Sequence, residues 1–151
     1  MIYVTHAFFS IFLSLIIAEV AHFPMHLTIF SVLGSLIPDI DEEKSFAGRV
    51  LIPLSGLVSM FGHRGVTHSL LGSVVFSLPL LLIGRETALF FFFGWLSHII
   101  ADSLNPSGVP FFFPFKKRYS FARIKSGSKQ EIVCFLLPLV IADVVLMLIS
   151  E

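Results

Sequence analysis

The sequence is poor in charge and nearly free of cysteine. Only 13% of its 151 residues are Asp, Glu, Lys or Arg, roughly half the share found in ordinary soluble domains. Hydrophobic residues make up 56%, and the mean hydropathy is +0.93. A single domain of this length cannot bury so much apolar surface in water, so we expect lipid to cover much of it. The one cysteine, Cys134, excludes an internal disulfide framework and a cysteine-rich zinc site.

Five apolar runs, separated by proline, glycine and polar residues, follow one another along the chain. A membrane helix needs about 20 apolar residues, and backbone groups in lipid must be paired within the segment, so the runs predict helices. The first run lacks a basic leader, which favours a retained span over a signal peptide. We expect one all-α, multi-pass membrane domain over residues 1–151, with an interfacial or re-entrant helix at 46–61. The expected spans are 3–21, 26–37, 66–83, 87–104 and 131–149; the second is short for a full crossing.

Lys and Arg divide unequally when these spans are threaded through a bilayer. Nine lie on the side that holds Met1, and Arg85 alone lies on the other side. Because cytoplasmic loops are enriched in Lys and Arg, we expect an inner (plasma) membrane protein with its N-terminus cytoplasmic and its C-terminus outside. The tract 111–115 and the bases 116–118 fit a surface that contacts lipid headgroups and a plain topogenic loop equally well. The zero net charge gives no indication of nucleic acid, and we expect none as a direct partner.

Polar residues able to carry chemistry gather at the helix ends on that same side. His98 and Asp102 are four residues apart and share one helix face. Asp39 and Asp41 follow Pro38 in a segment expected to be extended, so that both carboxylates point the same way. Histidine nitrogens and carboxylate oxygens are ordinary ligands of zinc and similar divalent ions. The predicted metal ligands are His6, Asp39, Asp41, His63, His68, His98, Asp102 and Glu131.

Each cluster taken alone has a simpler structural explanation. His98 with Asp102 is compatible with an interhelical hydrogen-bonded pair, the two aspartates with a solvated turn, and Glu131 with a first-turn acid that the helix dipole favours. Convergence of eight such residues from five helix ends favours a metal site, because ionisable groups within membrane spans are usually functional.

The segment from His63 to Ser69 predicts a loop that runs into a helix, with Thr67 as the N-cap. Its Arg64 guanidinium offers paired donors that suit a phosphate oxygen. A divalent ion with a free coordination position lowers the pKa of its bound water to about 7 and so supplies a nucleophile. We therefore expect Arg64 to orient an anionic substrate, and Asp41 to act either as a ligand or as a general base.

Three motifs carry a resemblance to a known family: LIPDID at 36–41, GHRGVTHSLL at 62–71 and GWLSHIIAD at 94–102. In order and spacing they resemble the YdjM-like family of inner-membrane metal-dependent hydrolases, over nearly the whole chain. A more distant link of that family to the zinc-dependent phospholipase C and nuclease superfamily implies phosphoester hydrolysis. Some members are described as binding the LexA repressor, which implies a regulator protein as a partner.

Three functions stay open at this point. The first is a metal-dependent membrane hydrolase with one to three divalent ions, zinc above others, acting on a phosphoester or lipid-linked substrate at the cytoplasmic face. The second is a non-catalytic metal-binding or transport protein, although a transporter should hold its ligands near the middle of the membrane. The third is a membrane anchor for a cytoplasmic regulator, in which the basic loop matters more than the histidines.

Overall fold

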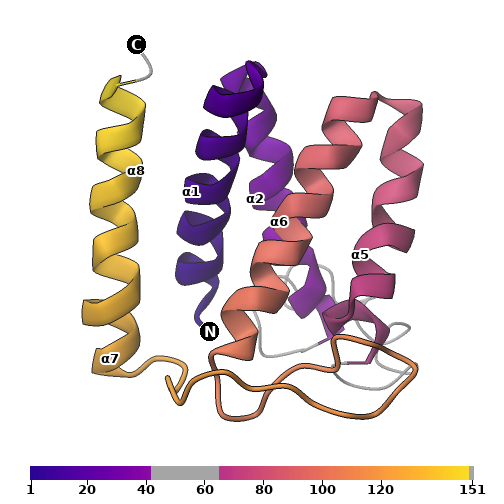
Figure 1. The fold of residues 1–151 in the computed structure, drawn as a ribbon, viewed down its shortest axis with the longest axis vertical. Coiled ribbons are helices and arrows are strands. Elements are labelled where there is room, and N and C mark those ends of the chain that lie inside the picture. The colour runs from indigo at the N-terminus through magenta and orange to yellow at the C-terminus, as the bar shows by residue number, and fades with distance from the viewer. Residues whose placement is uncertain (42–64, 150–151) are drawn as a thin grey trace.

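The computed structural model describes residues 1–41 and 65–149 (Figure 1). All regular structure within these two stretches is helical, and the nearest approach to a strand is an isolated antiparallel bridge between Val109 and Tyr119. The all-α prediction is therefore confirmed for the described part of the chain. The expected interfacial or re-entrant helix at 46–61 lies outside the described residues.

The helices run side by side between two ends of a bundle (Figure 1). We call the end with Met1, His68 and Asp102 the site end, and the end with His22 and Arg85 the far end. Helix α1 (Tyr3–Ala21) runs to the far end, and η1 (Met25–Leu27), α2 (Thr28–Leu36) and η2 (Ile37–Asp41) return. Next, η3 (Val66–His68), α5 (Leu70–Ser77) and η4 (Leu78–Leu82) run to the far end, and α6 (Arg85–Ser103) returns. Finally, α7 (Lys129–Glu131), the π-helical η5 (Ile132–Leu136) and α8 (Leu137–Ile149) run to the far end.

Local sequence explains where these helices begin and end. α1 stops at His22, which adopts a left-handed conformation with φ 56°, and Pro24 follows before the chain turns back. α5 begins at Leu70 because the Ser69 side chain accepts a hydrogen bond from the Gly72 N–H. The prediction of Thr67 as the N-cap was therefore wrong by two residues, since the chain is still in the short helix η3 at Thr67.

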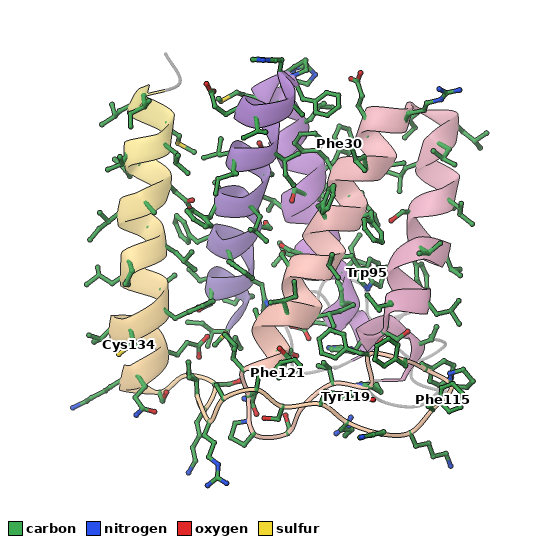
Figure 2. The ribbon with its side chains drawn as sticks, viewed as in Figure 1. Phe30, Trp95, Phe115, Tyr119, Phe121 and Cys134 are labelled. Atoms are coloured by element: carbon green, nitrogen blue, oxygen red, sulfur yellow. The ribbon has the colours of Figure 1, made fainter. Side chains whose placement is uncertain are left out.

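Glycines let α2 and α6 approach closely. A Cβ at Gly94 would lie 1.9 Å from the carbonyl oxygen of Ser31, and a Cβ at Gly34 would lie 2.2 Å from that of Phe91. Both distances are far below van der Waals contact, so these positions require glycine. Trp95 of α6 (Figure 2) stacks on Phe76 of α5 at 4.9 Å between ring centroids. α6 therefore packs against α2 on one side and against α5 on another. This packing fixes the position of His98 and Asp102 near its C-terminal end.

The long loop after α6 stays at the site end (Figure 1). The Phe121 N–H donates to the Ser103 carbonyl at 2.8 Å, and the Ile124 N–H donates to the Leu104 carbonyl at 3.0 Å. These bonds continue the end of α6 into the loop. The loop segment 120–125 is thereby fixed directly beside Asp102, the last ionisable residue of α6.

Two helices are long and apolar enough to cross a membrane: Tyr3–Ala21 and Lys129–Ile149. The helices Met25–Asp39 and Leu70–Leu82 are shorter, within 10–17 residues, and at 1.5 Å per residue they reach roughly 15–26 Å, against a hydrocarbon core of about 30 Å. The five helical rods thus lie close to the predicted ranges, but five full crossings are not confirmed.

Candidate metal centre

Four side chains from three elements meet at the site end. Asp39 comes from η2, His68 from η3, and His98 and Asp102 from α6. Each offers one ligand atom, and these four atoms all lie within 4.8 Å of one another. Both imidazoles and Asp102 are buried, whereas the Asp39 side chain is 16% exposed. The group is therefore compact and closed except on the side of Asp39.

The spacing of the ligand atoms matches what a divalent ion requires. The Nε2 atoms of His68 and His98 lie 3.3 Å apart. Each lies 3.5 Å from Asp39 Oδ1, and they lie 3.6 and 3.7 Å from Asp102 Oδ2. Zinc bonds of about 2.0–2.2 Å toward tetrahedral corners place neighbouring ligand atoms roughly 3.3–3.6 Å apart. The two imidazoles and two carboxylates therefore fit the corners of one tetrahedron, and the two negative charges balance a divalent cation.

Outer partners orient both imidazoles toward this point. His98 Nδ1 lies 2.7 Å from the Ser35 carbonyl; a carbonyl only accepts, so Nδ1 carries the proton and Nε2 of the neutral ring presents its lone pair inward. His68 Nδ1 lies 3.1 Å from the Thr67 hydroxyl, and the Thr67 carbonyl accepts a 2.7 Å bond from Trp95 Nε1. A backbone or hydroxyl partner on the outer nitrogen is the usual arrangement for metal-binding histidines.

Asp39 reaches the centre from a short helix. The prediction of an extended segment after Pro38 was wrong, because Ile37–Asp41 forms a 3₁₀ helix that continues α2. Burial by itself raises the pKa of the Asp39 carboxyl, but in the metal-free protein the charge of a protonated His98 and hydrogen bonds from both histidines outweigh it and hold that pKa below its usual range. Asp39 is thus held as a carboxylate, the form that binds metal.

His6 lies beside the four-residue group. Its ring stacks on that of His98 with centroids 3.9 Å apart and planes 16° from parallel, and its Nε2 lies 3.4 Å from Asp102 Oδ1. The amino group of Met1 also donates to Asp102 Oδ1. Asp102 therefore faces His68 and His98 with one oxygen, and His6 and the Met1 amine with the other.

Glu131 is fully buried but is not brought among the four ligand atoms. One carboxylate oxygen accepts a 2.8 Å bond from the Ile2 N–H, and the other accepts a 2.6 Å bond from the Gly127 N–H. Through the bond from Ile2, Glu131 in α7 connects the last helical segment to the residue that precedes α1. Its assignment as a metal ligand stays a prediction.

Three predicted site residues cannot be placed. His63 and Arg64 lie outside the described residues, and only the backbone of Asp41 is described, at the end of η2. The roles of Arg64 and Asp41 in catalysis, and of His63 and Asp41 in metal binding, stay predictions.

Sequence reasoning missed the outer partners of the imidazoles. A backbone carbonyl such as that of Ser35 has no signature in sequence, and only the close packing of α2 on α6 brings it to His98. Trp95 was more accessible to prediction. It is the one tryptophan of the chain and precedes His98 by three residues, so it shares a helix face with that histidine.

Comparisons with known proteins agree with a membrane protein. A family model described as YdjM inner membrane protein matches residues 1–149. The chain is 34% identical over 123 residues to the inner membrane protein YdjM of Escherichia coli (strain K12) and to that of Shigella flexneri, which covers 74% of this chain and 63% of each relative. The chain thus spans less than two thirds of the length of these two proteins.

A further relative comes from Bacillus subtilis. The chain is 33% identical over 112 residues to the uncharacterized protein YvsG of Bacillus subtilis (strain 168), which covers 72% of this chain and 70% of that protein. No solved structure gives a match. The comparisons therefore indicate the family and a location in the inner membrane. They name no activity, so any chemistry must be inferred from the geometry of the site.

Proposed function

The chain belongs to the YdjM family of inner membrane proteins, and from this premise we propose that it is a metal-dependent hydrolase that binds zinc or a similar divalent ion at the site end. The substrate class is a phosphoester, either lipid-linked or presented at the membrane surface. The site and the N-terminus face the cytoplasm, the chain crosses the inner membrane several times, and the C-terminus lies outside.

One observation carries this proposal: two imidazole nitrogens lie 3.3 Å from each other and 3.5–3.7 Å from two carboxylate oxygens, and all four atoms lie within 4.8 Å of one another. Without a cation, bringing two carboxylates together out of water is costly, because desolvation disfavours both charges. A divalent ion removes that cost and satisfies the four lone pairs together. Histidine with carboxylate suits zinc and leaves other divalent ions as alternatives.

When bound, a divalent ion lowers the pKa of a coordinated water to about 7 and polarises a phosphoryl oxygen. His68, His98 and Asp102 are the buried residues that hold it. Asp39 is the partly exposed ligand, so water and substrate reach the centre from its side. We assign the role of general base to Asp41, two residues further along the chain, and the orientation of the anionic substrate to the guanidinium of Arg64.

Asp102 is placed to serve more than one ion. Its Oδ2 faces His68 and His98, and its Oδ1 faces His6 at 3.4 Å. With a histidine beyond each of its oxygens, Asp102 could contribute to holding more than one ion. This supports the range of one to three ions, with His6 as the first residue of a second position.

A non-catalytic metal site is the second candidate. It is favoured because four protein side chains are available to hold the ion. Structural zinc sites have four protein ligands, whereas catalytic ones keep a position open for water. Catalysis at this centre therefore needs Asp39 to leave the ion or the ion to take a fifth ligand. Transport is disfavoured because the ligands lie at the ends of the helices rather than midway along them. Binding of a cytoplasmic regulator is a further role that the basic loop can serve independently of the metal.

Elemental analysis of the purified full chain tests metal binding. We expect about one or more equivalents of zinc or another divalent ion, lost in His98→Ala and Asp102→Asn. His26→Ala is the matched control, because His26 is an exposed histidine at the far end. Metal-free protein with an intact cooperative melting transition would contradict the proposal.

A screen of phosphoester substrates then separates hydrolase from structural site. We compare the activity of the metal-loaded protein, the chelator-treated protein and Asp39→Asn. Each is assayed at a temperature well below its own melting temperature, so that all three are folded. Hydrolysis that disappears with the ion while the fold persists supports the hydrolase. Stoichiometric metal whose removal unfolds the protein, with no turnover of any phosphoester, supports the structural site instead.

A further inference from the structure

A basic cleft lies beside the metal centre at the site end. It has a volume of about 610 Å³ and is lined by Pro106 and by five residues of the loop segment 120–125, among them Phe121, Arg123 and Lys125. None of the described residues that line it is Asp or Glu. Arg123 and Lys125 are exposed, and neither forms an ion pair with any residue in the described ranges. Among the described residues, the cleft thus presents two positive charges that no protein anion neutralises.

The position of this cleft is fixed relative to the centre. Phe121 and Ile124 donate backbone hydrogen bonds to the carbonyls of Ser103 and Leu104, which follow Asp102 directly in the chain. The wall of the cleft is therefore attached to the end of the helix that carries His98 and Asp102. An anion bound there lies at the same end of the bundle as the metal centre, beside the two residues that follow Asp102.

Arg123 also borders a second cavity on the lipid side. This cavity has a volume of about 280 Å³ and is lined by Arg123, Ile124, Gln130 and Cys134. Cys134 lies at the base of the last helix (Figure 2), in the segment Lys129–Ile149 that is long and apolar enough to cross a membrane. Its neighbours Ile132 and Val133 are exposed. Arg123 thus stands between a polar cleft and an apolar, lipid-facing surface.

We propose that residues 120–125 bind the phosphate of an anionic membrane phospholipid, with Arg123 as the phosphate-binding residue and Lys125 as a second positive charge. Guanidinium donates two parallel hydrogen bonds to a phosphate, which an ammonium cannot do. The exposed ring of Phe121 lines the same cleft, and aromatic rings are typical of the membrane interface. The acyl chains extend from the second cavity along the exposed side of the last helix. As a substrate subsite this inference rests on the proposed hydrolase; as a binding site it is measured without turnover.

Two positively charged groups in one cleft suit phosphates from water as well as from lipid. The cavity at Cys134 favours the lipid, because a soluble phosphoester has no apolar part to place there. Phosphatidylglycerol carries the phosphate and the chains, phosphatidylcholine carries both with a compensating positive charge, and glycerol phosphate carries the phosphate alone. These three probes separate the sources.

The experiment uses the full chain, delipidated in a neutral detergent, with lipid binding followed by native mass spectrometry. We expect wild type to prefer phosphatidylglycerol to phosphatidylcholine, and Arg123→Gln to weaken phosphatidylglycerol binding by about tenfold, the effect of losing one charge-assisted contact. Arg123→Lys should recover only part of the binding. Arg85→Gln is the matched control, because Arg85 is an exposed arginine at the far end that lines neither cavity, and we expect less than about a twofold change.

Three results would overturn the inference: equal binding of the two lipids, equal losses in Arg85→Gln and Arg123→Gln, or competition by glycerol phosphate at the concentration at which phosphatidylglycerol binds. Measuring the metal-loaded and chelator-treated protein in parallel keeps the two proposals apart. Arg123-dependent lipid binding without metal or hydrolysis supports the lipid site and removes the hydrolase. Metal-dependent hydrolysis that Arg123→Gln leaves unchanged, with no lipid preference, does the reverse.

Discussion

The two ends of the bundle use the same residue types in opposite ways. At the far end, His22 and His26 are exposed and stand beside exposed charges. At the site end, His6, His68 and His98 are all fully buried, and each has a ring nitrogen within 3.5 Å of a carboxylate oxygen. A buried imidazole has lost its water and must find a partner in the protein. Burial with a partner, rather than the presence of histidine, therefore distinguishes the functional end.

The largest effect is expected from removing one histidine at each end. His98→Ala removes a ligand and leaves the Ser35 carbonyl without its donor, so metal affinity should fall more than about 100-fold, since outer partners alone are worth 10–100-fold. His26→Ala should leave metal content unchanged. Elemental analysis after dialysis against a weak chelator measures both. If His98→Ala retained the metal as His26→Ala does, the histidines at the site end would not differ from those at the far end in metal binding.

Two glycine substitutions, one midway along α6 and one at the far end, test whether close helix packing assembles the centre. Gly94→Val places a Cβ against the Ser31 backbone, where even one added carbon lies 1.9 Å from an oxygen. We expect a loss of about 3 kcal/mol or more in the free energy of unfolding, together with lower metal content. At the far end, a Cβ at Gly84 has its nearest contact at 3.5 Å, so Gly84→Ala should be nearly neutral. Thermal melting in detergent measures the difference, and similar melting temperatures for the two variants would contradict it.

Trp95→Phe should weaken the centre without removing a ligand. The indole N–H holds the Thr67 carbonyl at 2.7 Å, next to His68 in the chain, and phenylalanine keeps most of the ring packing. We expect metal affinity to fall roughly 10-fold, at the lower end for an outer partner, with about 1 kcal/mol lost from stability. Phe91→Leu, a change in the same core cluster, is the control for packing alone. An equal loss of metal affinity in both variants would show that the hydrogen bond is immaterial.

The smallest effect concerns two buried carboxylates that differ in their partners. Asp102 faces three histidines, whereas both carboxylate oxygens of Asp143 in α8 are buried with no hydrogen-bond partner in the described part of the chain. Asp143→Leu should therefore raise the free energy of unfolding by about 1 kcal/mol, while Asp102→Leu should lower it and abolish metal binding. The melting temperatures of the two variants, compared with wild type, show whether each substitution stabilises or destabilises the protein. A destabilised Asp143→Leu would reveal a partner for that carboxyl.

Helix positions were accessible from the sequence, and local backbone geometry was not. The predicted first span at 3–21 coincides with α1, because Phe23 and Pro24 stop a long apolar run. The helix start at Ser69 and the 3₁₀ turn at Asp39 were missed. Both depend on which of several polar side chains or turns satisfies a few backbone groups, and neighbouring Thr, Ser and Asp residues offer alternatives of similar energy.

The candidate site divides in the same way. Periodicity placed His98 and Asp102 on one helix face, and the order of the spans placed Asp39, His68 and His6 at the same end. Which atoms stand at ligand distance followed only from the packing of α2 on α6 through Gly34 and Gly94. Glu131 is buried at the predicted end, yet its carboxylate oxygens accept hydrogen bonds from two backbone N–H groups.

The sequence by itself determined that this chain is helical, that its character is that of a membrane protein, and that its ionisable residues collect at one end. These properties follow from hydropathy and from the spacing of residues within a helix, which act over a few turns. The tertiary structure alone decided which side chains share one cation-sized space, how the imidazoles are oriented, and which basic residues form a cleft beside them. Those properties depend on ångström-scale distances between elements far apart in the chain, and no local pattern encodes them.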